Sequence, residues 1–163
     1  MDIESIKTFH NAVHVGDIET VRTMLAKDAT LATSVDEYEF QPIHLLDMYF
    51  EEEILNLLLA NGADINARND DGITLLHIVT DPEAVAVIVN RGADIEARDA
   101  SGRTPLIEQT NNQEDGIDVV VALLTMGANP NARDNDGETA LSIARDTDNQ
   151  DLIEALTVAG AKD

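Results

Sequence analysis

Four histidines come nearest, by type and spacing, to metal chemistry. His10 and His14 lie four residues apart in a stretch that predicts a helix, so both rings would share one helix face and could bind zinc. The zinc-protease helix also needs a glutamate directly after the first histidine, and this chain has Asn11 there, with no evident third ligand. We therefore expect no metal site and no cofactor.

Three of these histidines recur at a regular interval along the chain. His10, His44 and His77 are separated by 34 and 33 residues. If each belongs to one unit of a stacked repeat, neighbouring rings lie about 10 Å apart, the distance between packed helices. The ligands of a metal ion converge within a few ångströms, so these histidines are not expected to share one.

Two acidic stretches invite a catalytic or calcium-binding interpretation. Residues 51–53 are consecutive glutamates, which point in different directions on a helix and cannot form a catalytic pair. In "DNDGET" (134–139), a calcium loop with Gly137 at its sixth position would need side-chain oxygens from Ala132 and Ile143, which have none. The chain also lacks a glycine-rich phosphate loop and a Gly-x-Ser-x-Gly motif, so we expect no enzyme.

The composition narrows the class of protein further. The 163 residues contain no cysteine and 44% hydrophobic residues, enough for an aliphatic core without disulfides. The 10 basic and 32 acidic residues give a net charge of −22. This charge disfavours binding to nucleic acid and to anionic lipid and favours binding to a basic partner. The alternative is that the charge serves only solubility. The acidic start "MDIESIK" and the lack of a long apolar run predict no signal peptide, no membrane span and a cytoplasmic location.

The elements that position these residues come from one repeated phrase. "NGADINAR" (61–68), "RGADIEAR" (91–98), "MGANPNAR" (126–133) and "AGAKD" (159–163) each follow a predicted helix. Their glycines predict helix ends, since glycine readily adopts the left-handed conformation there. A second marker recurs as "QPIH" (41–44), "TLLH" (74–77), "TPLI" (104–107) and "TALS" (139–142), and a degenerate first copy reads "FHNAVHVGDIETVRTML" (9–25).

A period near 33 with these markers resembles the ankyrin-repeat family over essentially the whole chain. The resemblance implies an all-α solenoid of about five stacked helix-turn-helix repeats with projecting β-turn loops, forming a single domain over residues 1–163. The repeats would span approximately residues 3–35, 36–68, 69–98, 99–133 and 134–163. It also implies that the recurrent histidine is structural and bonds the backbone of the adjoining turn.

Three departures from the pattern predict local differences. The third repeat is three residues short, so we expect its first helix to end early at Pro82. The fourth repeat is two residues long through "TNNQEDGID" (110–118), which should lengthen the loop between its helices. Glu39 stands where the turn glycine is expected in the second repeat, which puts the shape of that loop in question.

In proteins that this chain resembles, partners bind a concave face built from the loops and first helices. The positions that map to that face are Glu37, Tyr38, Glu39, Phe40, Asp47, Met48, Tyr49, Asp70, Asp71, Ile73, Asp81, Arg103, Asn111 and Asn112. Four of the five aromatic residues lie within 38–50, and residues 37–71 contain nine acids and one base. We expect Tyr38 and Tyr49 to be exposed and Phe50 to pack inward.

The pattern thus predicts a non-catalytic protein-binding module, monomeric when unbound, whose acidic, tyrosine-bearing face over the second and third repeats holds a basic protein surface. A small inhibitor or immunity-type protein that masks a basic enzyme surface fits this charge. A scaffold or adaptor in a signalling or regulatory assembly is the alternative, and an enzyme built on the solenoid is the third possibility.

Overall fold

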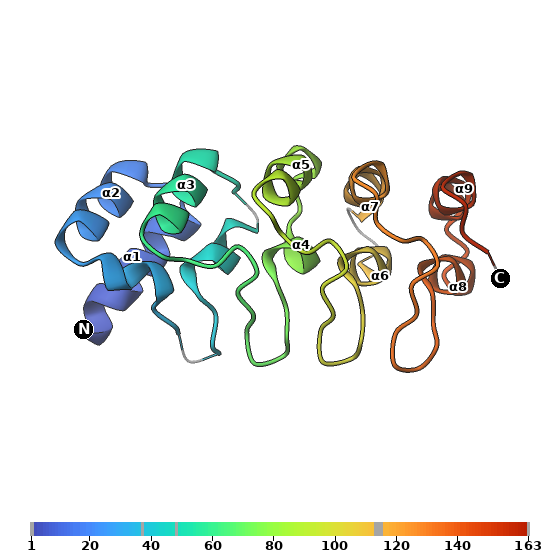
Figure 1. Cartoon of the computed structure of the whole chain (residues 1–163), viewed down its shortest axis with the longest axis horizontal. Coiled ribbons are helices and arrows are strands. Elements are labelled where there is room, and N and C mark those ends of the chain that lie inside the picture. The colour runs from blue at the N-terminus through green and yellow to red at the C-terminus, as the bar shows by residue number, and fades with distance from the viewer. Residues whose placement is uncertain (1, 37, 48, 113–115, 163) are drawn as a thin grey trace. The chain divides into compact units, whose positions relative to one another are not determined.

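A computed structural model describes residues 2–36, 38–47, 49–112 and 116–162 (Figure 1). The described residues form helices joined by turns, with no strand among them, which confirms the all-α expectation. The elements are α1 (Ile3–His14), α2 (Ile18–Lys27), η1 (Ala29–Thr33), η2 (Pro42–Leu46), α3 (Glu52–Ala60), α4 (Leu75–Ile78), α5 (Pro82–Asn90), α6 (Pro105–Asn111), α7 (Gly116–Thr125), α8 (Ala140–Asp146) and α9 (Gln150–Val158).

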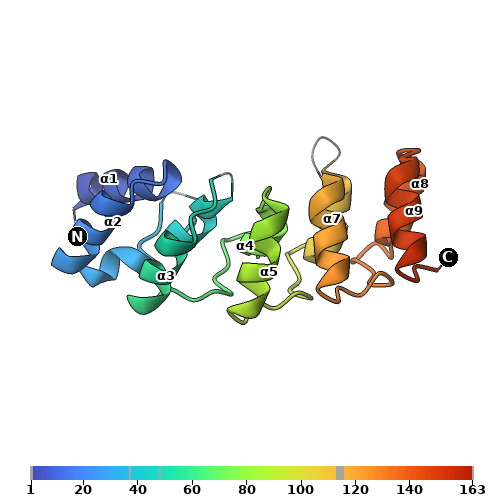
Figure 2. The ribbon, with the colours of Figure 1, turned by 90° about the horizontal axis from the view of Figure 1, so that it is seen from above.

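The chain divides into two compact units, residues 1–75 and 76–163. In the first unit, α1 packs against α2 and η2, and α3 packs against α2 and η2. In the second unit, α6 pairs with α7 and α8 pairs with α9, while α6 lies beside α8 and α7 beside α9 (Figures 1 and 2). Each unit therefore consists of helical hairpins laid side by side, as the repeat predicts.

The cores of both units are almost entirely aliphatic. In the first unit the largest buried side chains are Phe9, Ile43, Leu46, Ile54, Leu55, Leu58 and Leu75, and in the second they are Leu76, Ile88, Leu106, Ile107 and Leu123. Each of these side chains is less than 2% exposed, so each unit has an aliphatic core of its own.

Capping residues fix where the helices begin and end. The Asp17 carboxylate accepts the backbone N–H of Thr20 at 3.0 Å at the start of α2, and Thr139 and Ser142 form a reciprocal capping box at the start of α8. The glycines after α3, α5, α7 and α9 all have φ between 93° and 95°, in the left-handed region, as the sequence predicts.

The short third repeat corrects one prediction in detail. Its first helix, α4, is brief, but it ends at Ile78 and not at Pro82. Pro82 instead opens α5, where Asp81 is the N-cap and accepts the backbone N–H of Glu83 at 2.9 Å. Proline suits this first helical position because the N–H that it lacks would have no partner within the helix.

The other two departures lie in loops. In the fourth repeat α6 ends at Asn111 and α7 begins at Gly116, so the extra residues fall between the two helices, as predicted; residues 113–115 lie outside the described part.

Among the helices that the structure describes, none is long and apolar enough to cross a bilayer.

Candidate functional site

Each projecting loop is shaped by an Asp or Asn side chain at its start. In the second repeat, Asp36 Oδ1 accepts the backbone N–H groups of Tyr38 at 2.9 Å and Phe40 at 3.0 Å. The corresponding residues of the next three loops are Asn69, Asp99 and Asp134, and each accepts the same kind of bond. This side-chain turn holds the loop tips in place before any partner arrives.

Glu39 keeps the glycine turn despite its side chain. Its φ is 59°, in the left-handed region occupied by Gly72 at 77° in the next loop. The Glu39 N–H bonds the Asp36 carbonyl at 3.3 Å, as the Gly72 N–H bonds the Asn69 carbonyl at 3.0 Å. The described residues of this loop therefore make the same turn as the third repeat does, at the cost of a strained residue.

His44 is a structural residue that ties two repeats together. Its Nδ1 accepts the backbone N–H of Gln41 at 3.0 Å, so Nε2 carries the proton and donates to the carbonyls of Ala67 at 3.1 Å and Ile73 at 3.2 Å. His77 Nε2 likewise bonds the Arg103 carbonyl at 3.1 Å. Both rings are buried, and their role matches the one implied by the family resemblance.

His10 departs from this pattern because its partner is a side chain. The Ser34 hydroxyl donates its proton to the Leu31 carbonyl at 2.8 Å, so His10 Nε2 donates to the Ser34 oxygen at 3.0 Å. Burial lowers the pKa of His10 below its ordinary value. In the described part of the chain, no three histidine or carboxylate side chains lie close enough to hold a metal ion.

The two tyrosines are exposed, as the sequence predicts. The exposed fraction is 64% for Tyr38 and 59% for Tyr49, whereas Phe40 and Phe50 are half-buried. The edge of the Tyr49 ring meets the His14 ring with centroids 6.4 Å apart, and Phe40 meets His44 in the same way at 5.5 Å. Tyr38 precedes η2 in the chain and Tyr49 follows it.

The acidic residues of the predicted site differ in accessibility. Glu39, Asp70 and Asp71 are exposed on the loops, whereas Asp47 and Ile73 are half-buried. The Ile73 carbonyl accepts from His44, so the backbone of Ile73 supports the loop. Glu37 and Met48 lie outside the described residues.

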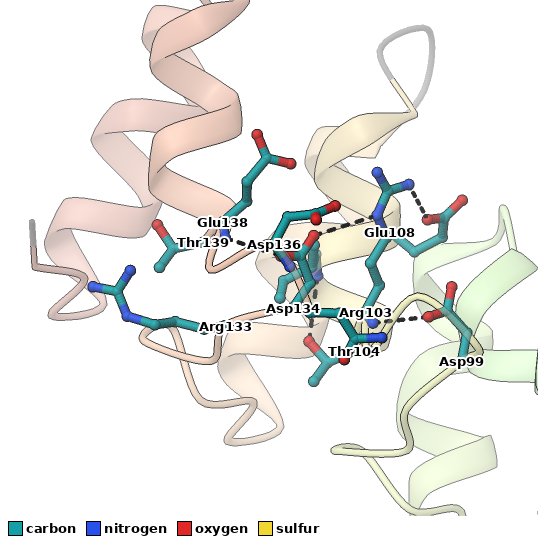
Figure 3. A network of polar contacts seen from close by, with 12 residues as sticks. Asp99, Arg103, Thr104, Glu108, Arg133, Asp134, Asp136, Glu138 and Thr139 are labelled. Atoms are coloured by element: carbon teal, nitrogen blue, oxygen red, sulfur yellow. Dashed lines mark hydrogen bonds and ion pairs between the residues drawn. The ribbon is translucent and has the colours of Figure 1, made fainter.

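In the second unit, two predicted site residues have structural contacts. Asp81 caps α5. Arg103 Nη1 donates to Glu108 at 3.1 Å, and its Nε lies 3.7 Å from the carboxylate of Asp134 (Figure 3). The hydrogen bond to Glu108 raises the pKa of Arg103 above its ordinary value. Arg103 thus bridges two loop-helix junctions.

Asn111 and Asn112 are exposed at the end of α6, where Asn112 is the C-cap. Of the predicted site, the structure therefore brings Tyr38, Glu39, Tyr49, Asp70 and Asp71 to the surface of the first unit. Asp81, Arg103, Asn111 and Asn112 belong to the second unit.

Sequence reasoning missed how arginines brace the loops. Arg68 Nη1 donates to the carbonyl of Gly72 at 3.3 Å, and Arg98 and Arg133 donate to Gly102 and Gly137, each at 2.7 Å. The signal was present, because an arginine stands four residues before each of these turn glycines. Arg98 Nη1 also donates to the Arg133 carbonyl at 2.6 Å, so it links its own loop to the next one.

Comparison with known proteins identifies the repeat. A family model described as "Ankyrin repeats (3 copies)" matches residues 43–134. Ankyrin repeat domain-containing protein 35 from Homo sapiens is 40% identical over 60 residues, which is 37% of this chain and 6% of that protein.

Two longer alignments cover most of the chain. The transient receptor potential cation channel subfamily A member 1 homolog from Caenorhabditis elegans is 30% identical over 147 residues, 90% of this chain and 12% of the relative. The BTB/POZ domain and ankyrin repeat-containing protein NPR1 from Malus hupehensis is 26% identical over 141 residues, 86% of this chain and 18% of the relative. The chain spans less than a fifth of the length of each of these three relatives.

Proposed function

Because the chain belongs to the ankyrin-repeat family, whose repeats are in general non-catalytic modules that bind other proteins, we propose that it binds a basic surface of another protein. The contact would be made by the acidic tyrosine surface, defined as Tyr38, Glu39, Tyr49, Asp70 and Asp71. The observation that carries this proposal is the exposure of both tyrosines, each more than half open to water in a unit that also exposes Glu39, Asp70 and Asp71. Tyrosine is enriched among the residues that dominate binding energy at interfaces.

The rigidity of the loops supports the same function. The Asp36 and Asn69 side chains already fix the backbone of the two loops that carry Tyr38 and the two aspartates. A partner therefore loses little of its binding free energy to ordering these loops. The carboxylates speed association with a cationic partner through long-range attraction.

We assign the module, as a cytoplasmic monomer until bound, to an inhibitor or immunity-type role in which it covers a basic enzyme surface. The charge of −22 supports this role, since it complements a cleft that binds nucleic acid or another anion. The second candidate is an adaptor. The name of the Malus hupehensis relative, which joins ankyrin repeats to a BTB/POZ domain, favours it.

The test replaces one tyrosine and one aspartate of the acidic tyrosine surface. Tyr49→Ala combined with Asp71→Ala should weaken capture of the partner by the tagged full chain by at least about tenfold, because an interface hot spot contributes about 2 kcal/mol. Binding by the unaltered chain should also fall between about 0.01 M and 0.15 M NaCl, as the Debye length shrinks from about 30 Å to about 8 Å. Quantitative mass spectrometry of the captured proteins measures both effects.

A matched control carries Glu154→Ala and Val158→Ala, which remove an exposed acid and an exposed apolar side chain from α9. It should bind as the unaltered chain does. Equal capture by the Tyr49/Asp71 variant, with an unchanged melting temperature, would rule out this surface. An activity assay then distinguishes the two roles. If the chain is an inhibitor, a stoichiometric amount of it abolishes the activity of the captured basic enzyme, whereas an adaptor leaves that activity intact.

A further inference from the structure

The first unit contains an apolar groove that the acidic tyrosine surface does not include. It has a volume of about 680 Å³ and runs along α1. Ile3, Ile6 and His14 line it from α1, Val35 and Asp36 line it from the junction of the first two repeats, and Leu45 lines it from η2. The α1 residues recur at helical spacing, so one face of α1 forms the whole of one wall.

Two of the apolar lining residues face water to an unusual degree. Ile3 is 72% exposed and Val35 is 39% exposed, although the buried side chains of the same unit are packed almost completely. A concave apolar surface of this size is typical of a binding site, because soluble proteins rarely leave such a surface uncovered.

Two residues that line the groove also contact the exposed tyrosines. Asp36 accepts the backbone N–H of Tyr38 at 2.9 Å. The His14 ring meets the Tyr49 ring with centroids 6.4 Å apart. The groove therefore adjoins two residues of the acidic tyrosine surface.

The charges around the groove indicate which sign of charge its occupant carries. The lining contains one lysine, Lys7, and one carboxylate, Asp36, so the groove itself is close to neutral. Residues 1–75 as a whole contain fifteen acidic and four basic residues, and one of the four, Arg22, is paired with Glu53. The surrounding field therefore favours an occupant with cationic flanks.

We propose that the groove along α1 holds an amphipathic helix of the partner, with an apolar stripe against Ile3, Ile6, Val35 and Leu45 and with lysine or arginine on its flanks. This inference rests on the proposed function and names the chemistry of its partner. The twelve residues of α1 give a wall about 18 Å long, enough for apolar anchors at positions i, i+3, i+4 and i+7 of a docked helix.

The test uses two synthetic peptides of about 14 residues, roughly four helical turns. Both carry the same leucine stripe, one with lysines and the other with glutamates on the polar face. The lysine peptide should bind the full chain more tightly, as measured by fluorescence anisotropy, and its affinity should fall with salt. Val35→Glu should weaken it by at least about tenfold, as for an interface hot spot.

Val121→Glu is the matched control, since Val121 is 43% exposed on α7 in the second unit and the substitution adds the same charge. It should leave binding unchanged. Added negative charge alone attracts the lysine peptide, so a loss at Val35 reports apolar contact. Failure of the lysine peptide to bind, tighter binding of the glutamate peptide, or equal effects of the two valine variants would each overturn the proposal.

Capture of a cellular partner by the two variants tests the groove separately from the acidic tyrosine surface. A captured partner that is lost with the Tyr49/Asp71 variant but retained with Val35→Glu would leave the acidic tyrosine surface standing and the groove refuted. A small apolar molecule found in the groove by native mass spectrometry of the purified chain would also overturn the helix as its occupant.

Discussion

His44 makes its three hydrogen bonds only as a neutral ring. Nδ1 accepts from Gln41 while Nε2 donates to Ala67 and Ile73, and a second proton on Nδ1 would face the Gln41 N–H. Burial lowers the pKa of this ring below its ordinary value, although the hydrogen bonds that Nε2 donates to the Ala67 and Ile73 carbonyls oppose the shift. The unfolded chain thus binds a proton more readily than the folded chain just below the ordinary imidazole pKa of about 6.5.

The fold should consequently lose stability in mild acid. Its stability from His44 is fully present above about pH 6.5 and falls as the pH drops from there towards the lowered pKa of the folded state. We expect a lower melting temperature at about pH 5.5 than at about pH 7.5. His44→Gln should reduce this difference while destabilising the protein by about 2 kcal/mol at neutral pH, through lost buried hydrogen bonds. His10→Gln should reduce the difference further, since the pKa of His10 is lowered by the same cause. Identical pH profiles for the unaltered chain and the double variant would contradict this origin.

At the scale of elements, Gln109 compensates for the shortness of the third repeat. The helix α4 has four residues, and its end leaves carbonyl groups without helical partners. Gln109 of α6 is buried, and its Nε2 donates to the carbonyls of His77 and Val79, both at 2.9 Å. One side chain of the fourth repeat thus completes the backbone of the third.

Replacing the Gln109 amide should lower the free energy of unfolding by more than the change in side-chain volume alone would. Gln109→Met keeps the approximate volume but removes both hydrogen bonds that Nε2 donates to the His77 and Val79 carbonyls, so we expect the free energy of unfolding to fall by about 2–4 kcal/mol. Asn111→Ala, on the exposed end of the same helix, should change it by less than about 0.5 kcal/mol. Urea denaturation of the full chain measures both values. A Met variant as stable as the Ala variant would show that water satisfies these carbonyls.

The elements themselves followed from the sequence because the repeat places them by local signals. The turn glycines, the capping residues and the spacing of aliphatic residues recur in several repeats. An irregular copy such as residues 9–25 could therefore be recognised by aligning it with the other repeats. The exposure of Tyr38 and Tyr49 was predictable for the same reason. The roles of Gln109 and Arg103 and the groove along α1 were not predictable, because they depend on which side chains meet across distant parts of the chain, 32 residues apart for Gln109 and His77.

At the scale of the whole molecule, the charge acts on folding and on binding with opposite dependence on salt. The fifteen acids and four bases of residues 1–75 match the seventeen acids and six bases of residues 76–163 in net charge, so repulsion burdens both units equally. Salt screens this repulsion and should stabilise the fold, whereas it weakens attraction to a basic partner.

We therefore expect the melting temperature to rise by a few degrees between about 0.01 M and 0.15 M NaCl, over the range in which partner binding falls. Asp146→Asn with Glu154→Gln should reduce the rise, because both residues are exposed and Asp146 lies at the C-terminal end of α8, where the helix dipole disfavours a negative charge. Scanning calorimetry at both concentrations measures the shift. A melting temperature independent of salt would mean that self-repulsion does not limit stability. If partner binding still weakened with salt, that effect would have to come from the carboxylates of the acidic tyrosine surface and not from the total charge.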